Sequence, residues 1–204
     1  MISVPRLYPI VDAASFSTTE DLLVFAGELV AGGCTVLQYR NKSGNARLML
    51  EQAREVKRGV GGNVKLIMND RADLCLVAEF DGVHVGQEDL SPESVRGIIG
   101  PDRWLGVSTH SPEQVQEADR SSADYIAIGP VFSTASKERP DPVVGLEGVC
   151  RARELTRKPL VAIGGITRAN AASVIEAGAD SVAVISDLLG EPRKSAEEFF
   201  RVLR

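Results

Sequence analysis

Short apolar runs recur along the chain, and each stops at a glycine or a polar residue. Clear examples lie within residues 31–38, 78–86, 121–129 and 177–186. In each, small residues typical of a helix end lead through a short turn into a β-branched run. Such runs predict strands that are buried on both faces. Their recurrence predicts a repeated strand–helix unit.

Eight strands are expected in all, and helical patterns follow them. The predicted strands lie near residues 6–11, 34–39, 64–69, 82–85, 104–108, 124–128, 159–163 and 181–185. The alternating order predicts a parallel sheet with helices outside it. Eight units favour an α/β fold of the closed (β/α)8 TIM barrel type, and an open doubly wound sheet is the alternative. The length of 204 residues predicts a single barrel domain over 1–204.

Helix boundaries follow from amphipathic spacing and from cap residues. Helices are expected over 19–30 (starting at Thr19 or Glu20), 46–60, 167–177 and 191–203, and further helices start at Ser91-Pro92 and Ser111-Pro112. The longest irregular stretch, 130–144, follows the sixth strand. Its prolines, its hydroxyl residues and Lys137 predict a mobile loop over a site.

Composition narrows the class of partner and the compartment. The net charge of −5, with 28 acidic and 23 basic side chains, argues against nucleic acid or an anionic membrane as a partner. Three widely spaced cysteines predict small buried hydrophobic residues in a reducing compartment. No signal peptide is visible, and no apolar run approaches the roughly 18 residues of a membrane span. We therefore expect a cytoplasmic protein.

Polar residues gather where the predicted strands end, which is where barrel enzymes build their active sites. Gln38, Arg40 and Lys42 alternate along the second strand and point to one side if it continues. Three donors, two of them cationic, suit a phosphate or diphosphate, although a solvated rim of paired charges is an equal alternative.

Two acids follow neighbouring strands. Asp70 and Asp89 are hard oxygen ligands of the kind that suits Mg²⁺ together with diphosphate oxygens. The alternatives are a helix cap for Asp70 and a turn for Asp89.

Two further features bear on ligand binding and catalysis. Gly164-Gly165 precedes a predicted helix, so its backbone could bind phosphate at the helix N-terminus, with Ile185-Ser186 next to it. His84 is expected to line the barrel, and His110 to support a helix start. Neither has a partner for a nucleophilic triad.

Linked motifs carry a family resemblance. They are Gln38-x-Arg40-x-Lys42, Asn69-Asp70, His84-Val-Gly-Gln-Glu-Asp89, Gly106-Val-Ser-Thr-His110, Gly129-Pro-Val-Phe132 with Thr134-x-Ser136-Lys137, Ile163-Gly-Gly-Ile166 and Val184-Ile-Ser186. Their joint order and spacing resemble thiamine-phosphate synthase from about residue 7 to residue 188.

The resemblance implies a transferase of thiamine biosynthesis. Such an enzyme joins hydroxymethylpyrimidine diphosphate to thiazole phosphate and releases diphosphate by a dissociative, Mg²⁺-assisted substitution. It implies substrate-binding roles for Gln38, Tyr39, Arg40, Asn41, Lys42, Asn69, Ser108, Thr134, Ala135, Ser136, Lys137, Gly165, Ile185 and Ser186. It also implies catalytic roles for Arg40, Lys42, Ser108 and Lys137, and Mg²⁺ ligation by Asp70 and Asp89. The partners implied are these small molecules, and a homo-oligomer is possible.

Three alternatives stay open. The related thiazole tautomerase generally has a histidine where this chain has Pro130, and it lacks the Gln-Glu-Asp motif, so it is disfavoured. Another phosphate-binding barrel enzyme shares the fold but does not explain the strand-end cluster. A ligand-sensing or scaffold barrel is the non-enzyme alternative. Asn41 and Ser136 stand where the family often has glutamate and threonine, which bears on affinity more than on reaction type. Asn41 lies between the inferred ligands and is expected on the far side of the strand, and Ser136 keeps the hydroxyl.

Overall fold

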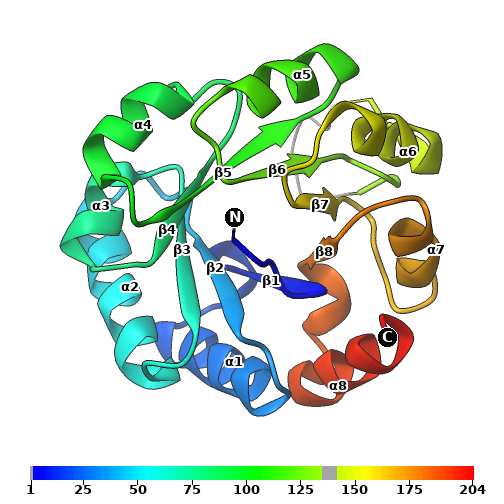
Figure 1. Ribbon diagram of the computed structural model, residues 1–204. Coiled ribbons are helices and arrows are strands. Elements are labelled where there is room, and N and C mark those ends of the chain that lie inside the picture. The colour runs from blue at the N-terminus through cyan, green and yellow to red at the C-terminus, as the bar shows by residue number, and fades with distance from the viewer. Residues whose placement is uncertain (1, 135–141) are drawn as a thin grey trace.

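The eight predicted strands pair in sequence order and close on themselves (Figure 1). The structure is a computed structural model that describes residues 2–134 and 142–204. Every neighbouring pair of strands is parallel, including β1 with β8. The strands are β1 Leu7–Asp12, β2 Val36–Arg40, β3 Lys65–Asn69, β4 Gly82–Val85, β5 Trp104–Thr109, β6 Tyr125–Ile128, β7 Leu160–Ile163 and β8 Ser181–Val184. The closed barrel is confirmed, and the open sheet is excluded.

Helices form the outer layer, as Figure 1 shows. They are α1 Thr19–Ala31, α2 Ala46–Val60, α3 Ala72–Val77, α4 Pro92–Ile99, α5 Pro112–Arg120, α6 Gly145–Leu155, α7 Ala171–Glu176 and α8 Pro192–Val202, with short 3-10 turns η1 Ala13–Ser15 and η2 Ser186–Leu188. Both Ser-Pro starts are confirmed, since the side chains of Ser91 and Ser111 cap α4 and α5. The predicted start at Thr167 is wrong, because its N–H donates to the Asn170 side chain in a turn before α7.

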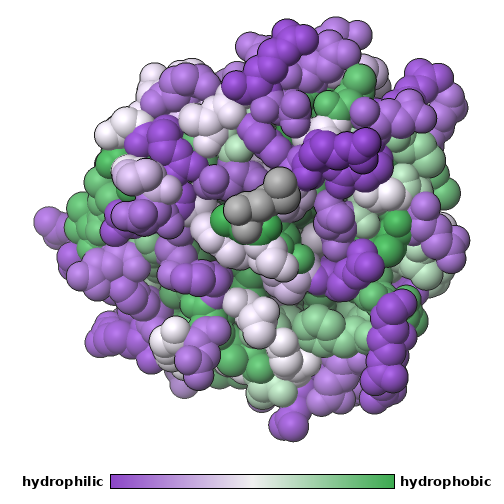
Figure 2. Space-filling view, viewed as in Figure 1, coloured by the Kyte–Doolittle hydropathy of each residue, from purple (hydrophilic) through white to green (hydrophobic). Residues whose placement is uncertain are grey.

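Successive strand residues point alternately to two apolar cores. Leu7 and Val11 face the helices, whereas Tyr8 and Ile10 face the barrel interior. The N-terminal segment lies over the centre of the barrel in Figure 1, and its Ile2 packs against the interior cluster. In the space-filling view from the same side, apolar surface shows near the centre and polar surface dominates the rim (Figure 2).

One expectation about the cysteines is wrong. Cys34 and Cys75 are buried, but Cys150 is exposed on α6. The buried face of α6 carries Val149 and Ala152, three residues apart, so position 150 points to solvent. Within 2–134 and 142–204, every helix is too short or too polar to cross a membrane.

Three aspartates in the recurring sequence pattern each bind a leucine of the preceding strand through two hydrogen bonds, an arrangement called here an aspartate clamp. Asp81, Asp124 and Asp180 stand directly before β4, β6 and β8. Each carboxylate accepts the N–H of a leucine in the preceding strand at 2.8–2.9 Å, and each aspartate N–H donates to the carbonyl of that same leucine at 2.7–2.8 Å. The leucines are Leu66, Leu105 and Leu160. The pattern thus ties strands together at their amino ends, opposite the expected site.

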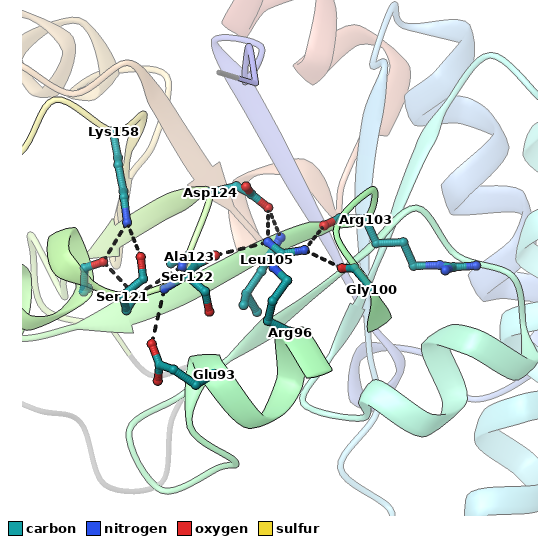
Figure 3. A network of polar contacts seen from close by, with 11 residues as sticks. Glu93, Arg96, Gly100, Arg103, Leu105, Ser121, Ser122, Ala123, Asp124 and Lys158 are labelled. Carbon is teal, nitrogen blue, oxygen red and sulfur yellow. Dashed lines mark hydrogen bonds and ion pairs between the residues drawn. The ribbon is translucent and has the colours of Figure 1, made fainter. Parts of the chain in front are cut away.

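The second clamp is reinforced by an arginine (Figure 3). Arg96 of α4 donates to the Asp124 carboxylate at 2.6 Å and to the carbonyl of Ser122 at 3.1 Å. It also donates to the carbonyls of Gly100 and Arg103 at 2.8 and 2.7 Å. One side chain therefore satisfies three backbone carbonyls and one carboxylate.

We expect Arg96→Ala to lower the free energy of unfolding by about 2–4 kcal/mol, because these acceptors would lose their donor in a half-buried setting. Urea denaturation measures the change. Arg151→Ala is the matched control, since among the described residues Arg151 pairs with Glu147 alone and both side chains are mostly exposed. Its effect should stay within about 0.5 kcal/mol. Equal effects of the two substitutions would contradict a structural role for the clamp.

Candidate active site

A cavity opens at the carboxyl ends of the strands. The predicted site residues that line it are Gln38, Arg40, Asn69, Ser108, Thr134, Gly165, Ile185 and Ser186. They come from six different segments of the chain, so the barrel brings them together. Ala135, Ser136 and Lys137 lie outside the described residues, as does the middle of the predicted 130–144 loop.

Alternation along β2 divides the predicted residues between two faces. Gln38 and Arg40 face the cavity. The side chains of Tyr39 and Asn41 face α2 instead, where both donate to the Gln52 amide oxygen at 2.8 Å. Both side chains therefore lie on the far side of β2, as expected for Asn41, because successive side chains of a strand point to opposite faces. A substrate contact of Tyr39 or Asn41 stays a prediction.

The two predicted metal ligands lie near one another, and Asp70 directly follows the cavity-lining Asn69, although Lys42, Asp70 and Asp89 are not themselves among the residues that line the cavity. Asp70 forms an ion pair with Lys42. Burial raises the pKa of Asp70, the Lys42 pair opposes that shift, and the negative charge of Asp89 raises the pKa further. The Asp89 carboxylate accepts the Gly86 N–H at 2.7 Å, so it also stabilises the turn in which it lies. Asp70 does not cap α3, whose N-cap is Arg71.

The backbone at Asp70 adopts a rarely populated conformation that two backbone hydrogen bonds hold in place. Its φ of 62° lies in the left-handed region, where aspartate is among the few tolerated residues. The N–H of Arg71 donates to the Asn69 carbonyl at 2.8 Å across a three-residue turn, and the Asp70 N–H donates to the His84 carbonyl at 2.8 Å. Such strain is concentrated at functional sites.

The strand-end charges do not favour an anion by themselves. Arg40 pairs with Asp12 at 2.5 Å, and Lys42 pairs with Asp70. With Asp89 added, these five described side chains carry a formal net charge of −1. A diphosphate would be repelled unless further positive charge entered the site. Asp12 ends β1 and was missed from the sequence, although a polar residue at a strand end is the signal used for the other strands.

Among the described residues, three buried side-chain polar atoms lack a hydrogen-bond partner, and one of them belongs to a residue that lines the cavity. Within the described part of the chain, Asn69 Nδ2 is buried and makes no hydrogen bond, while Asn69 lines the cavity. Leaving a buried amide unsatisfied costs about 1–3 kcal/mol. The amide is therefore suited to donate to a bound acceptor such as a phosphate oxygen.

Polar side chains form a connected floor beneath the cavity. Gln38 Nε2 donates to the Tyr8 hydroxyl at 3.2 Å, and the Tyr8 and Tyr125 hydroxyls are 2.8 Å apart. His84 Nδ1 lies 3.1 Å from the Tyr125 hydroxyl, and His84 Nε2 lies 2.8 Å from Ser108 Oγ. Burial raises the pKa of Tyr8 to about 12, and it raises that of Tyr125 well above 10. Both phenols are therefore neutral at ordinary pH.

Sequence reasoning placed His84 correctly as a barrel-lining residue but missed both tyrosines. Inward positions of β1 and β6 gave a usable signal, because a tyrosine at such a position needs a partner for its hydroxyl. His110 makes a contact beyond the expected one. Its backbone N–H donates to the Gln114 side chain, so it does support the start of α5 as expected. In addition, its ring Nδ1 lies 2.6 Å from the Gly129 carbonyl oxygen, and the residue lines the cavity.

The Gly164-Gly165 turn lies beside the cavity, but not at a helix end. Both glycines have positive φ, 102° and 63°. A Cβ on either one would lie 2.5 Å from the 130–133 segment. These glycines are required by the packing of that segment, and α7 begins six residues after Gly165. The glycine pair therefore does not stand directly at a helix N-terminus, whereas Gly165, Ile185 and Ser186 do border one side of the cavity, and phosphate binding there stays a prediction.

The closed barrel and its polar cavity at the strand carboxyl ends define a (β/α)8-barrel enzyme of the kind that binds phosphorylated small molecules. Comparison with known proteins narrows the class. The family described as thiamine monophosphate synthase matches residues 7–188. The chain belongs to that family.

Individual relatives agree with the assignment. The thiamine-phosphate synthase of Koribacter versatilis is 59% identical over 99% of this chain and 97% of its own length. That of Chloroflexus aurantiacus is 43% identical over 89% of this chain and 83% of its own. Among solved structures, thiamine phosphate pyrophosphorylase from Pyrococcus furiosus superposes with a TM-score of 0.86 at 33% identity, covering 97% of this chain and 95% of that one.

Proposed function

We propose that the protein joins hydroxymethylpyrimidine diphosphate to thiazole phosphate, giving thiamine phosphate and diphosphate. Membership of the thiamine-phosphate synthase family makes it a transferase of thiamine biosynthesis. We further propose that the substitution is dissociative and assisted by Mg²⁺, and that residues 1–204 form one catalytic barrel domain located in the cytoplasm.

The proposal that Mg²⁺ is required rests on the charge balance of the side chains that follow the strand ends. Two cations and three carboxylates leave these side chains net negative before substrate arrives. Within the described residues, no group of three or more histidine, cysteine, aspartate or glutamate side chains gathers to enclose a metal. Two carboxylates with open positions fit Mg²⁺, which commonly binds one or two carboxylates together with substrate phosphates.

In this proposal Asp70 and Asp89 hold Mg²⁺. The ion would supply positive charge against the departing diphosphate. The carbon–oxygen bond to diphosphate breaks first, the pyrimidinylmethyl cation forms, and the thiazole nitrogen then bonds to it. No protein nucleophile is needed.

The remaining roles follow from placement. Arg40 lines the cavity, and Lys42 pairs with Asp70, the residue after the cavity-lining Asn69; both would hold diphosphate as negative charge develops. Asn69 would direct its unpaired amide to the same group, and Ser108 and Gln38, which also line the cavity, would hold the pyrimidine diphosphate. Thr134, Gly165, Ile185 and Ser186 border the part of the cavity proposed for the thiazole phosphate. Lys137, from the sequence alone, adds a further cation for diphosphate.

The first test mixes the protein with both substrates and Mg²⁺ and measures thiamine phosphate by fluorescence after oxidation. We expect product that depends on both substrates and disappears when EDTA removes the metal. Absence of product from a folded protein that binds a substrate would contradict the proposal and make the tautomerase assay the next measurement. Product that persists in EDTA would remove the proposed role of Mg²⁺ while leaving the transferase.

A further inference from the structure

The polar floor of the cavity has a direction that its hydrogen-bonding groups impose. Gln38 Nε2 is a donor only, so the Tyr8 hydroxyl accepts from it. The single hydrogen of Tyr8 is then left for the Tyr125 oxygen, 2.8 Å away. Tyr125 in turn has one hydrogen, which lies 3.1 Å from His84 Nδ1 as its acceptor.

The same reasoning continues to the cavity. With Nδ1 accepting, a neutral His84 carries its hydrogen on Nε2, and that hydrogen points at Ser108 Oγ, 2.8 Å away. Ser108 then accepts from the ring, and its own hydrogen is free to be donated elsewhere. Ser108 is half-buried and lines the cavity, so the acceptor that suits it is a bound substrate.

We propose that Gln38, Tyr8, Tyr125 and His84 form a one-directional hydrogen-bond relay that makes the Ser108 hydroxyl a donor to substrate. Tyr125 is then a positioning residue for the reaction, because it acts through His84 and does not line the cavity itself. The proposed role of Ser108 towards substrate rests on the proposed function, whereas the direction of the relay can be measured without substrate.

A glycine provides independent support for the relay. Gly106 lies between Tyr125 and His84 on the inner face of β5. A Cβ at this position would lie 2.1 Å from Tyr125 Cζ, 2.3 Å from its hydroxyl oxygen and 2.4 Å from His84 Nδ1. Any side chain at position 106 would therefore displace the central contact of the relay.

The direct test is the tautomer of His84 in the free protein, read from long-range ¹H–¹⁵N NMR spectra. The chain has two histidines, so a His110→Gln variant assigns the two ring systems. We expect the hydrogen of His84 on Nε2. A hydrogen on Nδ1, or a mixture of the two tautomers, would overturn the proposal, because the relay would then run the other way or in neither direction. This measurement needs no variant at position 125.

Variants test whether the relay reaches Ser108. Tyr125→Phe removes the central hydroxyl and retains the ring, so we expect changed His84 ring shifts and a loss of about tenfold in kcat/KM, the lower end of the range for groups that orient a contacting residue. In a Ser108→Ala background the same change should have no further effect on kcat/KM. Equal losses in both backgrounds would show that Tyr125 does not act through Ser108 and would overturn its role.

The control is Tyr39→Phe. It also removes a buried hydroxyl, but one bonded to Gln52 on the outer face of the barrel, so the His84 shifts should stay unchanged. Shifts that move equally with Tyr39→Phe would mean that they report general loosening, which contradicts the relay. Failure of the relay and of the proposed function are distinguishable. Product with an Nδ1–H tautomer overturns the relay alone, and an Nε2–H tautomer without product overturns the transferase alone.

Discussion

Asp89→Asn should lower kcat/KM for thiamine phosphate by about 100- to 1,000-fold while the protein stays folded, the size of loss seen when one stabilising group for developing charge is removed. The amide can still accept the Gly86 N–H, so the turn keeps its hydrogen bond and only the charge is lost. We expect the Mg²⁺ concentration for half-maximal rate to rise, since one of two carboxylate ligands has gone. Steady-state kinetics over a range of Mg²⁺ concentrations measures both effects.

A neighbouring carboxylate provides the control for this prediction. Glu88 is exposed in the same loop, so Glu88→Gln removes an equal charge one residue away. Its kcat/KM should stay within about twofold, because an exposed charge is screened by solvent. Similar losses in both variants, or an unchanged rate in Asp89→Asn, would remove Asp89 from the proposed metal site.

Arg40→Gln should lower kcat/KM by a comparable 100- to 1,000-fold, roughly, because a cation facing the cavity would no longer hold the departing diphosphate. It should also lower the free energy of unfolding by about 2 kcal/mol. Asp12 is only 9% exposed at its side chain, so the loss of Arg40 leaves a nearly buried carboxylate without its cation.

A double variant separates these two effects. Adding Asp12→Asn to Arg40→Gln removes the unpaired charge and should recover most of the stability in urea denaturation. The activity should not recover, since the cation for diphosphate is still absent. Recovery of activity together with stability would mean that Arg40 matters only for folding.

The barrel and its strand bounds could be predicted from the sequence because each buried run is short and apolar and ends at a glycine or a polar residue. The carboxyl-end residues followed from the same pattern, since every strand of a barrel presents its last polar residues at one end. The face of each side chain was harder to predict. The resemblance implied substrate-binding roles for Tyr39 and Asn41, and alternation along β2 places both side chains outside the barrel, as expected for Asn41.

Other features depend on contacts between residues that are far apart in the sequence, so they could not be predicted from it. Tyr8 and Tyr125 are 117 residues apart in sequence, and only closure of the barrel brings their hydroxyls together. The reason for Gly164 and Gly165 was also hidden, because the segment that fills the space beside them comes from the end of β6. The sequence suggested phosphate binding as the reason for this pair, and the structure adds close packing against residues 130–133 as a second reason.

The aspartate clamps divide the barrel into quarters. The three clamps join β3 to β4, β5 to β6 and β7 to β8. Before β2 the chain has Thr35 in place of an aspartate, so β1 and β2 form the fourth pair without such a clamp. Each clamped pair with its intervening helix has contacts that are short in sequence, and such local units close with little loss of chain entropy. Folding is then expected to proceed by these strand–helix–strand quarters. During refolding, the backbone N–H groups of Leu66, Leu105 and Leu160 should become protected from hydrogen exchange early. The chemistry at the opposite end can diverge without disturbing that assembly.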